Sequence, residues 1–270
     1  MASTIRVGVV GAGGNTRKFH IPNLKKIDGV AVVAVVNRSR ASSERVAQEF
    51  GIARVHDHWQ QLVNDPGIDA VVIGTWPYLH CPITLAALRA GKHVLTEARI
   101  AMNAAEAREM LAASRARPDL VTQVVPGPTT FAADPMIMHL LADGYVGDLQ
   151  SVDLRVCTGW LNRDAPLHWR MNRDYSGLNI MSMGIWYECL SRWVGPAKSI
   201  MARTRVAVPY RFDEERGERR PVDVPDHVEV LADLANGAIA RMHWSSVAAF
   251  RPAPEDWRYG SEGTLRFEVQ

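Results

Sequence analysis

A chain of 270 residues of which 47% are hydrophobic can build one large domain or two of ordinary size, and a soluble globular protein is expected. Lysine and arginine total 31 against 29 acidic residues, so charge indicates neither nucleic acid nor a membrane as partner, and small molecules remain. Three scattered cysteines and the lack of a long apolar run exclude a disulfide framework and a membrane span, and the cytoplasm is the expected location.

The first 125 residues alternate short β-branched runs with segments of helical period. Strands are expected at residues 5–10, 31–36, 70–73, 93–96 and 121–125. Helices are expected at residues 42–50 and 83–90. The glycines that follow them, Gly51 and Gly91, stand where a C-cap residue adopts a positive φ. This alternation predicts an α/β domain over residues 1–125 with the doubly wound parallel sheet of a Rossmann fold.

The pattern changes after residue 125, and residues 126–270 are predicted to form a second domain. A helix is expected near residues 136–142, a strand at 150–158 and a helix at about 178–193, followed by several strands. This order predicts an α+β domain with an open, mainly antiparallel sheet. The densely charged residues 211–220 are predicted to be a solvated hairpin connection and not a binding patch.

The strongest local signal is a strand that runs into the glycine-rich turn Gly11-Ala12-Gly13-Gly14-Asn15-Thr16. Gly11 permits the tight turn, and Gly13 lets the backbone approach a pyrophosphate at the start of the next helix. Thr16 stands at the third glycine position of the usual pattern, where a larger side chain is expected to loosen helix–sheet packing. Strand, turn, helix and second strand follow in the right order, so dinucleotide binding is favoured over a structural turn.

The end of the second strand, Asn37-Arg38-Ser39-Arg40, bears on the choice of coenzyme. An acidic residue there would hydrogen-bond the ribose 2′-hydroxyl of NAD, and this segment has none. Two guanidinium groups beside neutral Asn37 favour a 2′-phosphate, so NADP is preferred over NAD. The alternative is that Arg38 stacks on the adenine and Arg40 is solvated, which leaves NAD open.

Further motifs are spread along nearly the whole chain: His20-Ile21-Pro22, residues 68–75, His80, residues 86–97, residues 144–148, Asp226-His227 and residues 260–265. Together with the glycine turn they are jointly specific, and the chain resembles the Gfo/Idh/MocA oxidoreductases. The resemblance implies a Rossmann domain joined to an open-sheet domain and NAD(P)-dependent chemistry on sugars, polyols or related carbonyl and hydroxyl compounds. It also implies a homo-oligomer that associates through the open sheet.

The resemblance fails at the residues with which that family does its chemistry. The usual Glu-Lys-Pro, whose lysine lies beside nicotinamide and substrate, aligns with Glu97-Ala98-Arg99, and a methyl group cannot transfer a proton. The family's helix carrying Asp and, four residues later, His aligns with Ser182 and Trp186, which share one helix face and are expected to look into the same pocket. Family members also usually continue beyond the segment matching residues 260–269, so the chain is expected to be shortened or to lack its last sheet element.

Three residues are candidates for catalysis. Arg99 stays protonated and could polarise an oxyanion, with a surface ion pair as its alternative role. His168, in a polar loop, has a reference pKa of about 6.5 and could transfer a proton, or it could simply be exposed to solvent. Tyr78 follows the fourth strand and could donate a hydrogen bond to substrate or nicotinamide ribose. Proton transfer is therefore expected from Tyr78, His168 or a water molecule.

Other residues are predicted to bind substrate or cofactor. Trp169 and Arg170 could stack on a sugar or clamp a carboxylate, although Trp169 could equally anchor the loop to the core. With Ser182, Trp186 and Tyr187 they make up the predicted substrate-binding set. Predicted cofactor contacts are Gly11, Gly13, Gly14, Asn15, Thr16, Asn37, Arg38, Ser39, Thr75, Trp76, His80, Glu97 and Ala98.

No metal site is expected. The motif His56-Asp57-His58 offers ligand types that suit zinc, but a third or fourth ligand is not identifiable. Asp57 is instead predicted to cap a helix at residues 59–63.

The leading hypothesis is an NAD(P)-dependent oxidoreductase that acts on a small polar substrate. One alternative is an enzyme that retains its nucleotide and catalyses elimination, hydration or glycoside cleavage. Another is a catalytically inactive, NAD(P)-binding regulatory protein, since all three expected ionisable groups are absent.

Overall fold

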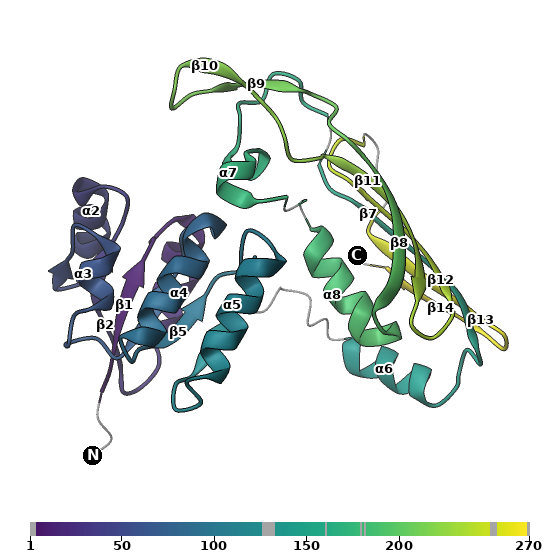
Figure 1. Cartoon of the computed structure of the whole chain (residues 1–270), viewed down its shortest axis with the longest axis horizontal. Coiled ribbons are helices and arrows are strands. Elements are labelled where there is room, and N and C mark those ends of the chain that lie inside the picture. The colour runs from purple at the N-terminus through teal and green to yellow at the C-terminus, as the bar shows by residue number, and fades with distance from the viewer. Residues whose placement is uncertain are drawn as a thin grey trace. The chain divides into compact units, whose positions relative to one another are not determined.

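The computed structural model describes residues 4–125, 133–159, 161–178, 180, 182–248 and 253–268. The chain divides after Val125 into two compact units, and Figure 1 colours the first from purple to teal and the second from teal to yellow. Within the described ranges, no helix combines the length and apolar character that crossing a bilayer requires.

The first unit is built on a six-stranded sheet in the order β3-β2-β1-β4-β5-β6. The strands are β1 (Ile5–Val10), β2 (Val30–Val36), β3 (Arg54–Val55), β4 (Ala70–Ile73), β5 (His93–Thr96) and β6 (Thr122–Val124). Every neighbouring pair is parallel, and the strand order reverses between β1 and β4. The predicted doubly wound Rossmann sheet is confirmed.

Helices pack on the sheet through two apolar clusters. The α-helices are α1 (Ile21–Leu24), α2 (Arg40–Phe50), α3 (Trp59–Val63), α4 (His80–Arg89) and α5 (Ala104–Arg115), with a π-helical turn η1 (Thr16–His20) and a 3-10 turn η2 (Pro77–Leu79). Val10 packs in a cluster with residues of α3 and α4, whereas its neighbour Val9 packs with residues of α1 and α2. Because successive strand residues point to opposite faces, both faces of the sheet are covered.

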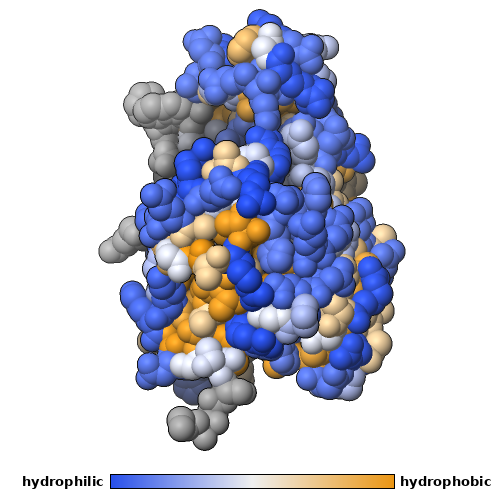
Figure 2. Space-filling model, turned by 90° about the vertical axis from the view of Figure 1, so that its left-hand side faces the viewer, coloured by the Kyte–Doolittle hydropathy of each residue, from blue (hydrophilic) through white to orange (hydrophobic). Residues whose placement is uncertain are grey.

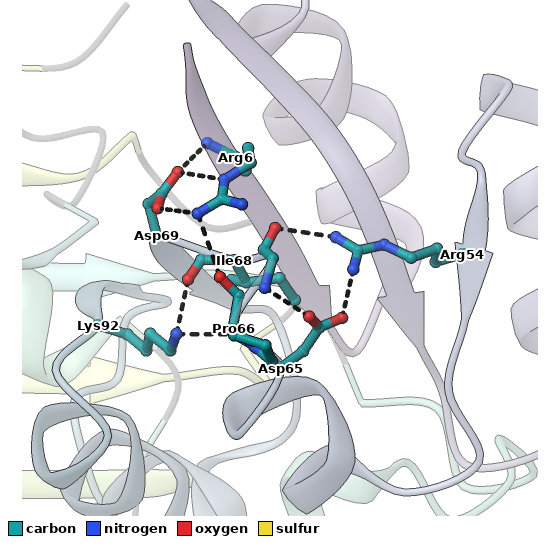
Figure 3. Close-up of polar contacts among 8 residues, drawn as sticks. Arg6, Arg54, Asp65, Pro66, Ile68, Asp69 and Lys92 are labelled. Atoms are coloured by element: carbon teal, nitrogen blue, oxygen red, sulfur yellow. Dashed lines mark hydrogen bonds and ion pairs between the residues drawn. The ribbon is translucent and has the colours of Figure 1, made fainter. Parts of the chain in front are cut away.

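Charged side chains hold together the amino edge of this sheet, where the parallel strands begin (Figure 3). Asp69 accepts hydrogen bonds from the backbone nitrogen, Nε and Nη2 of Arg6, at 2.8, 2.9 and 2.7 Å. Lys92 Nζ is buried and donates to the carbonyl oxygens of Asp65 and Ile68, at 3.0 and 2.7 Å. The Asp65 carboxylate in turn pairs with Arg54 at 2.6 Å. These bonds tie the loop before β4 to β1, β3 and the start of β5.

The second unit contains a six-stranded sheet in the order β14-β13-β7-β12-β11-β8. The strands are β7 (Leu149–Cys157), β8 (Ala197–Arg205), β11 (His227–Leu234), β12 (Ile239–Ser245), β13 (Glu255–Gly260) and β14 (Thr264–Glu268). Only β7 and β12 run parallel among these neighbours, so the predicted mainly antiparallel sheet is confirmed.

One face of this second sheet is covered and the other is open. Helices α6 (Asp134–Ala142) and α8 (Met183–Val194) lie against one face, where Val228 and Val230 join a large apolar core (Figure 1). Along β11 the burial alternates, and Glu229 and Leu231 point to the opposite face and are exposed. This alternation is typical of a sheet with one solvated face.

The charged segment 211–220 forms a hairpin, as predicted, with β9 (Tyr210–Asp213) paired with β10 (Glu218–Pro221). Most of its side chains are exposed or half-buried. Arg211 is the exception within the segment: it is 6% exposed, and its Nη1 donates to the carbonyl oxygens of Asn162 and Ala165, each at 2.8 Å.

Two shorter helices precede α8: the 3-10 turn η3 (Trp169–Met171) and α7 (Arg173–Ser176). Helix α8 begins at Met183, later than the predicted residue 178, because Ser182 before it has a φ of 66° and interrupts helical geometry. The predicted stretch also includes residues 179 and 181, which lie outside the described ranges.

Apolar side chains reach the surface in places. The exposed large hydrophobic residues of the first unit include Ile5, Phe19 and Ile27. Figure 2 views the molecule from the left-hand side of Figure 1 and shows hydrophobic side chains gathered in one patch within a mostly hydrophilic surface. A contiguous apolar patch is a surface suited to contact with another molecule.

Candidate functional site

The carboxyl edge of the first sheet gathers most of the predicted cofactor residues. Gly11 follows β1, Asn37 follows β2, Thr75 lies two residues after β4, and Glu97 follows β5. Because these strands are parallel, their ends meet on one edge. In doubly wound sheets ligands bind at this edge, where the strand order reverses.

The glycine turn is closed on its protein side. Gly11 has a φ of 83°, and a Cβ there would lie 2.7 Å from the backbone nitrogen of Thr75. A Cβ on Gly74 would lie 2.5 Å from the carbonyl oxygen of Gly11 and would collide with Thr16 Oγ1. Thr16 is only 1% exposed, and its hydroxyl donates to the carbonyl oxygen of Gly11 at 3.3 Å. The missing side chain of Gly74 thus makes room for Thr16, and the expected loosening of the packing is not observed.

The same turn is open on its outer side. A Cβ on Gly13 or Gly14 would meet no atom of the described residues within 4 Å, and neither glycine has a positive φ. Both residues are exposed at the start of the helical segment that leads into η1. Backbone amides at such a position bind phosphate groups. The turn therefore fits the diphosphate of a dinucleotide.

Asn37 links this turn to the first turn of α2. Its Oδ1 accepts a hydrogen bond from the backbone nitrogen of Ala12 at 2.7 Å, and its Nδ2 donates to Ser42 Oγ at 3.0 Å. Ser39 caps α2, since its Oγ accepts from the backbone nitrogen of Ser42 at 3.3 Å. Both side chains are thus used for local order at the edge of the predicted coenzyme site.

The two arginines that follow Asn37 have different surroundings. The Arg38 guanidinium lies over the ring of Trp76, 6.0 Å from its centroid. Arg40 pairs with Glu44 and Asp57, each at 2.8 Å. Arg40 is therefore neutralised by two carboxylates, whereas Arg38 lies with an aromatic ring beside the strand ends.

A carboxylate–imidazole contact that the sequence did not identify lies at the end of β5. His20 Nε2 is 2.5 Å from Glu97 Oε1, and Asn15 Nδ2 donates to the same oxygen. Burial raises the pKa of Glu97, but the hydrogen bonds from His20 and Asn15 outweigh it and hold that pKa below its ordinary value. Glu97 is thus an anion that fixes the His20 ring, and both side chains are only 14% exposed. The signal for His20 was its motif with Ile21 and Pro22, which indicated the family but no role.

His80 joins the two loops that follow β4 and β5. Its Nδ1 lies 2.8 Å from the carbonyl oxygen of Arg99, and its Nε2 lies 2.9 Å from that of Thr75. Burial lowers the pKa of His80, against the raising effect of these carbonyl groups. His80 is only 1% exposed, so the ring holds these two loops together from beneath the surface, and a contact with a cofactor stays a prediction. Near it, Tyr78 is 37% exposed and Ala98 is exposed.

The second unit contains a cavity of about 270 Å³ that brings together two of the predicted loop residues. Its lining includes His168 and Arg170, together with Arg211 and Asp226, which the sequence did not single out as site residues. The Arg170 guanidinium lies 4.3 Å from the ring centroid of Trp169. His168 Nδ1 accepts from the backbone nitrogen of Arg170 at 3.3 Å, so this imidazole also starts η3. The accessible surface of the cavity is mainly apolar, with charged side chains among its lining residues.

The predicted substrate residues of α8 lie at or in the core of the second unit. Trp186 is 7% exposed and belongs to its apolar cluster. The Tyr187 hydroxyl accepts a hydrogen bond from the backbone nitrogen of Ala197 at 3.0 Å. Ser182 is half-buried immediately before the helix. The packing accounts for Trp186 and Tyr187, and contact of these residues with a substrate stays a prediction.

The histidine motif near residue 57 is not arranged as a metal site. Asp57 pairs with Arg40, and His56 Nε2 lies 3.3 Å from Asp65 Oδ2. Helix α3 begins after His58 and not after Asp57, and Gln61 Oε1 accepts from the backbone nitrogens of both residues. The predicted N-cap role of Asp57 was therefore wrong by one residue, because the side chain of Asp57 turns to Arg40.

Comparison with known proteins covers both units. Residues 5–124 match the model of the oxidoreductase family with an NAD-binding Rossmann fold, and residues 136–266 match the GFO/IDH/MocA C-terminal domain. An uncharacterised oxidoreductase of Synechocystis is 27% identical over 97% of this chain and 71% of its own length. Levoglucosan dehydrogenase of Pseudarthrobacter phenanthrenivorans is 26% identical over 88% of this chain and 65% of its own length.

Two further comparisons agree with these. A dTDP-3,4-didehydro-2,6-dideoxy-alpha-D-glucose 3-reductase of Streptomyces antibioticus is 28% identical over 98% of this chain and 75% of its own length. The crystal structure of an oxidoreductase domain protein from Kribbella flavida superposes with a TM-score of 0.82 at 25% identity, covering 99% of this chain and 74% of that one. The two family matches together span nearly all of the sequence, and the chain belongs to the Gfo/Idh/MocA family of oxidoreductases.

Proposed function

We propose that this chain binds NADP at the carboxyl edge of its first sheet and oxidises or reduces a sugar, a polyol or a related compound with a polar carbonyl or hydroxyl group. The observation that carries the proposal is the glycine turn. A Cβ would collide with Thr75 at Gly11 but would meet no described atom within 4 Å at Gly13 or Gly14. Membership of the family supports the redox chemistry, and the names of the sugar dehydrogenase and reductase relatives support the substrate class. When bound, the dinucleotide supplies the hydride acceptor or donor.

Binding of the coenzyme divides between two groups of residues. The amides at the start of the helical segment, at Gly14 and Asn15, would hold the diphosphate, and Gly13, whose own amide donates to the carbonyl oxygen of Gly11, would let it approach. Arg38, beside Trp76, would pair with the 2′-phosphate, since guanidinium groups donate forked hydrogen bonds to phosphate oxygens. The preference for NADP follows from Arg38 and from the absence of a carboxylate at positions 37–40.

Proton transfer cannot come from Ala98, and His20 is the candidate that the geometry adds to Tyr78 and His168. Glu97 orients the His20 ring as the third group of a catalytic triad orients its base. His20→Gln, which keeps a side chain able to reach Glu97, should lower turnover by about 10² to 10⁴-fold while leaving coenzyme affinity within a few-fold. A loss of turnover at unchanged coenzyme affinity in this variant, and not in Tyr78→Phe, would identify His20.

The coenzyme proposal is tested first on the protein as purified. Mass spectrometry of the denatured chain for NADP and NAD, and calorimetric titration with each, measure what binds. Gly13→Ala should leave the melting temperature unchanged and weaken dinucleotide binding at least about tenfold, because the added methyl group meets only the ligand. Gly184→Ala is the matched control, since its Cβ also meets no described atom within 4 Å but lies in α8. Absence of binding by either dinucleotide would refute the proposal.

The preference for NADP is tested separately with the two arginines. Arg38→Ala should weaken NADP binding by about 10- to 100-fold and NAD binding only slightly, since hydrogen bonds to charged groups contribute about 1.5–3 kcal/mol. Arg40→Ala is the control, because Glu44 and Asp57 already hold its guanidinium. Equal losses of the two coenzymes in Arg38→Ala would contradict the assignment.

Association of copies through the open face of the second sheet remains part of the proposal. Met201, Leu231 and Ile239 are 74, 50 and 56% exposed, and the strand register places them on this face. Leu231→Lys should shift an oligomer toward monomer in sedimentation velocity, and a wild-type chain that sediments as a monomer would exclude the association. The three cysteines are buried and form no disulfide, which accords with the expected reducing cytoplasm.

A further inference from the structure

Two imidazoles and a carboxylate converge on the open face of the second sheet. His227 and Glu229 are two residues apart on β11, and His243 stands directly opposite Glu229 on β12. Strand residues two apart share a face with their cross-strand partners, so all three side chains project from the same side of the sheet. Their exposed fractions are 32% for His227, 50% for Glu229 and 22% for His243. Because all three residues lie within paired strands, the sheet fixes the positions of their Cα atoms.

The spacing of the three side chains matches that of a metal coordination sphere. Glu229 Oε1 lies 2.7 Å from His243 Nδ1 and 3.3 Å from His227 Nε2, and the ligand atoms all lie within 4.8 Å of one another. Tetrahedral zinc has bonds of about 2.0–2.1 Å, which places its ligand atoms about 3.3 Å apart. A metal ion therefore needs only small side-chain adjustments and no movement of the strands. Among the described residues, these three form the group of histidine and acidic side chains whose ligand atoms lie close enough together to hold one metal ion.

The donor atoms select the class of metal. With a single carboxylate among the ligands, hard cations such as calcium or magnesium, which need several oxygen ligands, are disfavoured. Two imidazole nitrogens instead suit zinc, cobalt(II) or nickel(II). Arg205 stands opposite His227 and Arg203 opposite Glu229 on β8, while Arg155 stands opposite His243 on β7, and their charges oppose any divalent cation, so the ligand set has to outweigh this repulsion.

We propose that His227, Glu229 and His243 form a site for a divalent transition metal of the zinc class. Three protein ligands leave a fourth coordination position on the open side of the sheet, the face through which copies of the chain are proposed to associate. Zinc sites with three protein ligands and an open position can take water or a small anion there. The assignment is independent of the dinucleotide site, because all three ligands belong to the second unit.

The test is a metal titration of the full, untagged chain after removal of bound metal with EDTA. Cobalt(II) should bind with one equivalent per chain and give the visible absorption of a tetrahedral nitrogen–oxygen site, and zinc should displace it. His243→Ala and His227→Ala should each weaken binding by more than about 100-fold, which exceeds the 10–100-fold cost of losing an outer-shell partner. Glu229→Gln, which keeps the shape of the side chain, should weaken binding by at least about tenfold on the same scale.

A matched control separates this site from ordinary surface histidines. His139 forms an exposed i,i+4 pair with Asp143 at 3.2 Å on α6, and His139→Ala should leave the titration unchanged. Far-ultraviolet circular dichroism in EDTA and calorimetric binding of NADP are measured on every variant. Both should match the wild type, which keeps loss of metal binding distinct from loss of fold or of the coenzyme site. The proposal is overturned if wild-type binding is substoichiometric, or if His139→Ala weakens it as much as His243→Ala does.

Discussion

The two edges of the parallel sheet in the first unit are built by different means. At the amino edge, Arg6 donates to the Asp69 carboxylate and Lys92 donates to two carbonyl groups, so the edge is closed by side chains (Figure 3). At the carboxyl edge, Gly11 is packed against Thr75, whereas Gly13 and Gly14 leave the outer side of the turn uncovered. The sheet therefore uses its amino edge to hold its loops together and its carboxyl edge to offer backbone amides to a ligand. Changes at the amino edge should therefore alter stability alone, and changes on the outer side of the glycine turn should alter affinity alone.

The largest effect is expected beneath the turn. Gly74→Ala would place a Cβ 2.5 Å from the carbonyl oxygen of Gly11, and backbone atoms there cannot move aside as a flexible side chain does. Overpacking of this kind should lower the free energy of unfolding by about 3 kcal/mol, measured by urea denaturation. Gly14→Ala is the control and should change stability by less than about 1 kcal/mol, because its Cβ meets no described atom. Wild-type stability of Gly74→Ala would show that the turns after β1 and β4 do not approach so closely.

A smaller loss is expected from the buried lysine of the amino edge. Lys92→Met keeps the length of the side chain but leaves the carbonyl oxygens of Asp65 and Ile68 without this donor. The free energy of unfolding should fall by about 2 kcal/mol, the usual cost of unsatisfied buried groups. Dinucleotide affinity should not change. Lys26→Met, at an exposed position, is the control. A Lys92→Met variant with wild-type stability but weakened coenzyme binding would contradict the proposal that the amino edge affects stability alone.

The smallest effect is expected from Asp69, and it should depend on pH. The hydrogen bond from the Arg6 side chain is the main cause that lowers the pKa of Asp69 to about 2, against a raising effect of burial. The folded state thus favours the carboxylate, so its stabilisation is complete above the unfolded pKa of about 3.9 and is lost as the pH falls toward the folded value. Both side chains are more than a third exposed, and Asp69→Asn should cost only about 1 kcal/mol at pH 7.

Urea denaturation at several pH values measures this effect. The difference between wild type and Asp69→Asn should shrink between about pH 4 and pH 2. Asp119→Asn removes a more exposed partner, that of Arg117, and should show a smaller difference throughout. A constant difference across the acid range would mean that the ion pair with Arg6 does not stabilise the amino edge.

Most of the first sheet could be predicted from the sequence, because buried strands are continuous β-branched runs. The bounds of β1, β4 and β5 agree with the predicted residues 5–10, 70–73 and 93–96. Strand β3 has only two residues, too few to show a period. Helix α5 buries Met110 alone along its length, so its sequence carries no strong apolar stripe, and it was not predicted.

The site could be predicted only where its geometry is local. The glycine turn is a continuous segment, and its backbone requirements are visible in the residue types. The contact of His20 with Glu97 joins residues 77 positions apart, and the buried position of Arg211 depends on carbonyl groups near residue 163. The grouping of His227, Glu229 and His243 depends on the register of β11 against β12. None of these can be inferred from spacing along the chain.

The amide of Asn37 limits how the coenzyme choice of this protein can be redesigned. An acidic residue at this strand end is the obvious change toward NAD. Aspartate would keep the oxygen that accepts from Ala12 but would replace the donor that faces the hydroxyl and the carbonyl oxygen of Ser42. A second oxygen there would face the Ser42 carbonyl at about 3.3 Å and push against the first turn of α2. Because the Ser42 carbonyl oxygen belongs to the main chain, no substitution of the Ser42 side chain removes the repulsion, and an engineered switch of specificity has to place its acidic residue elsewhere than position 37.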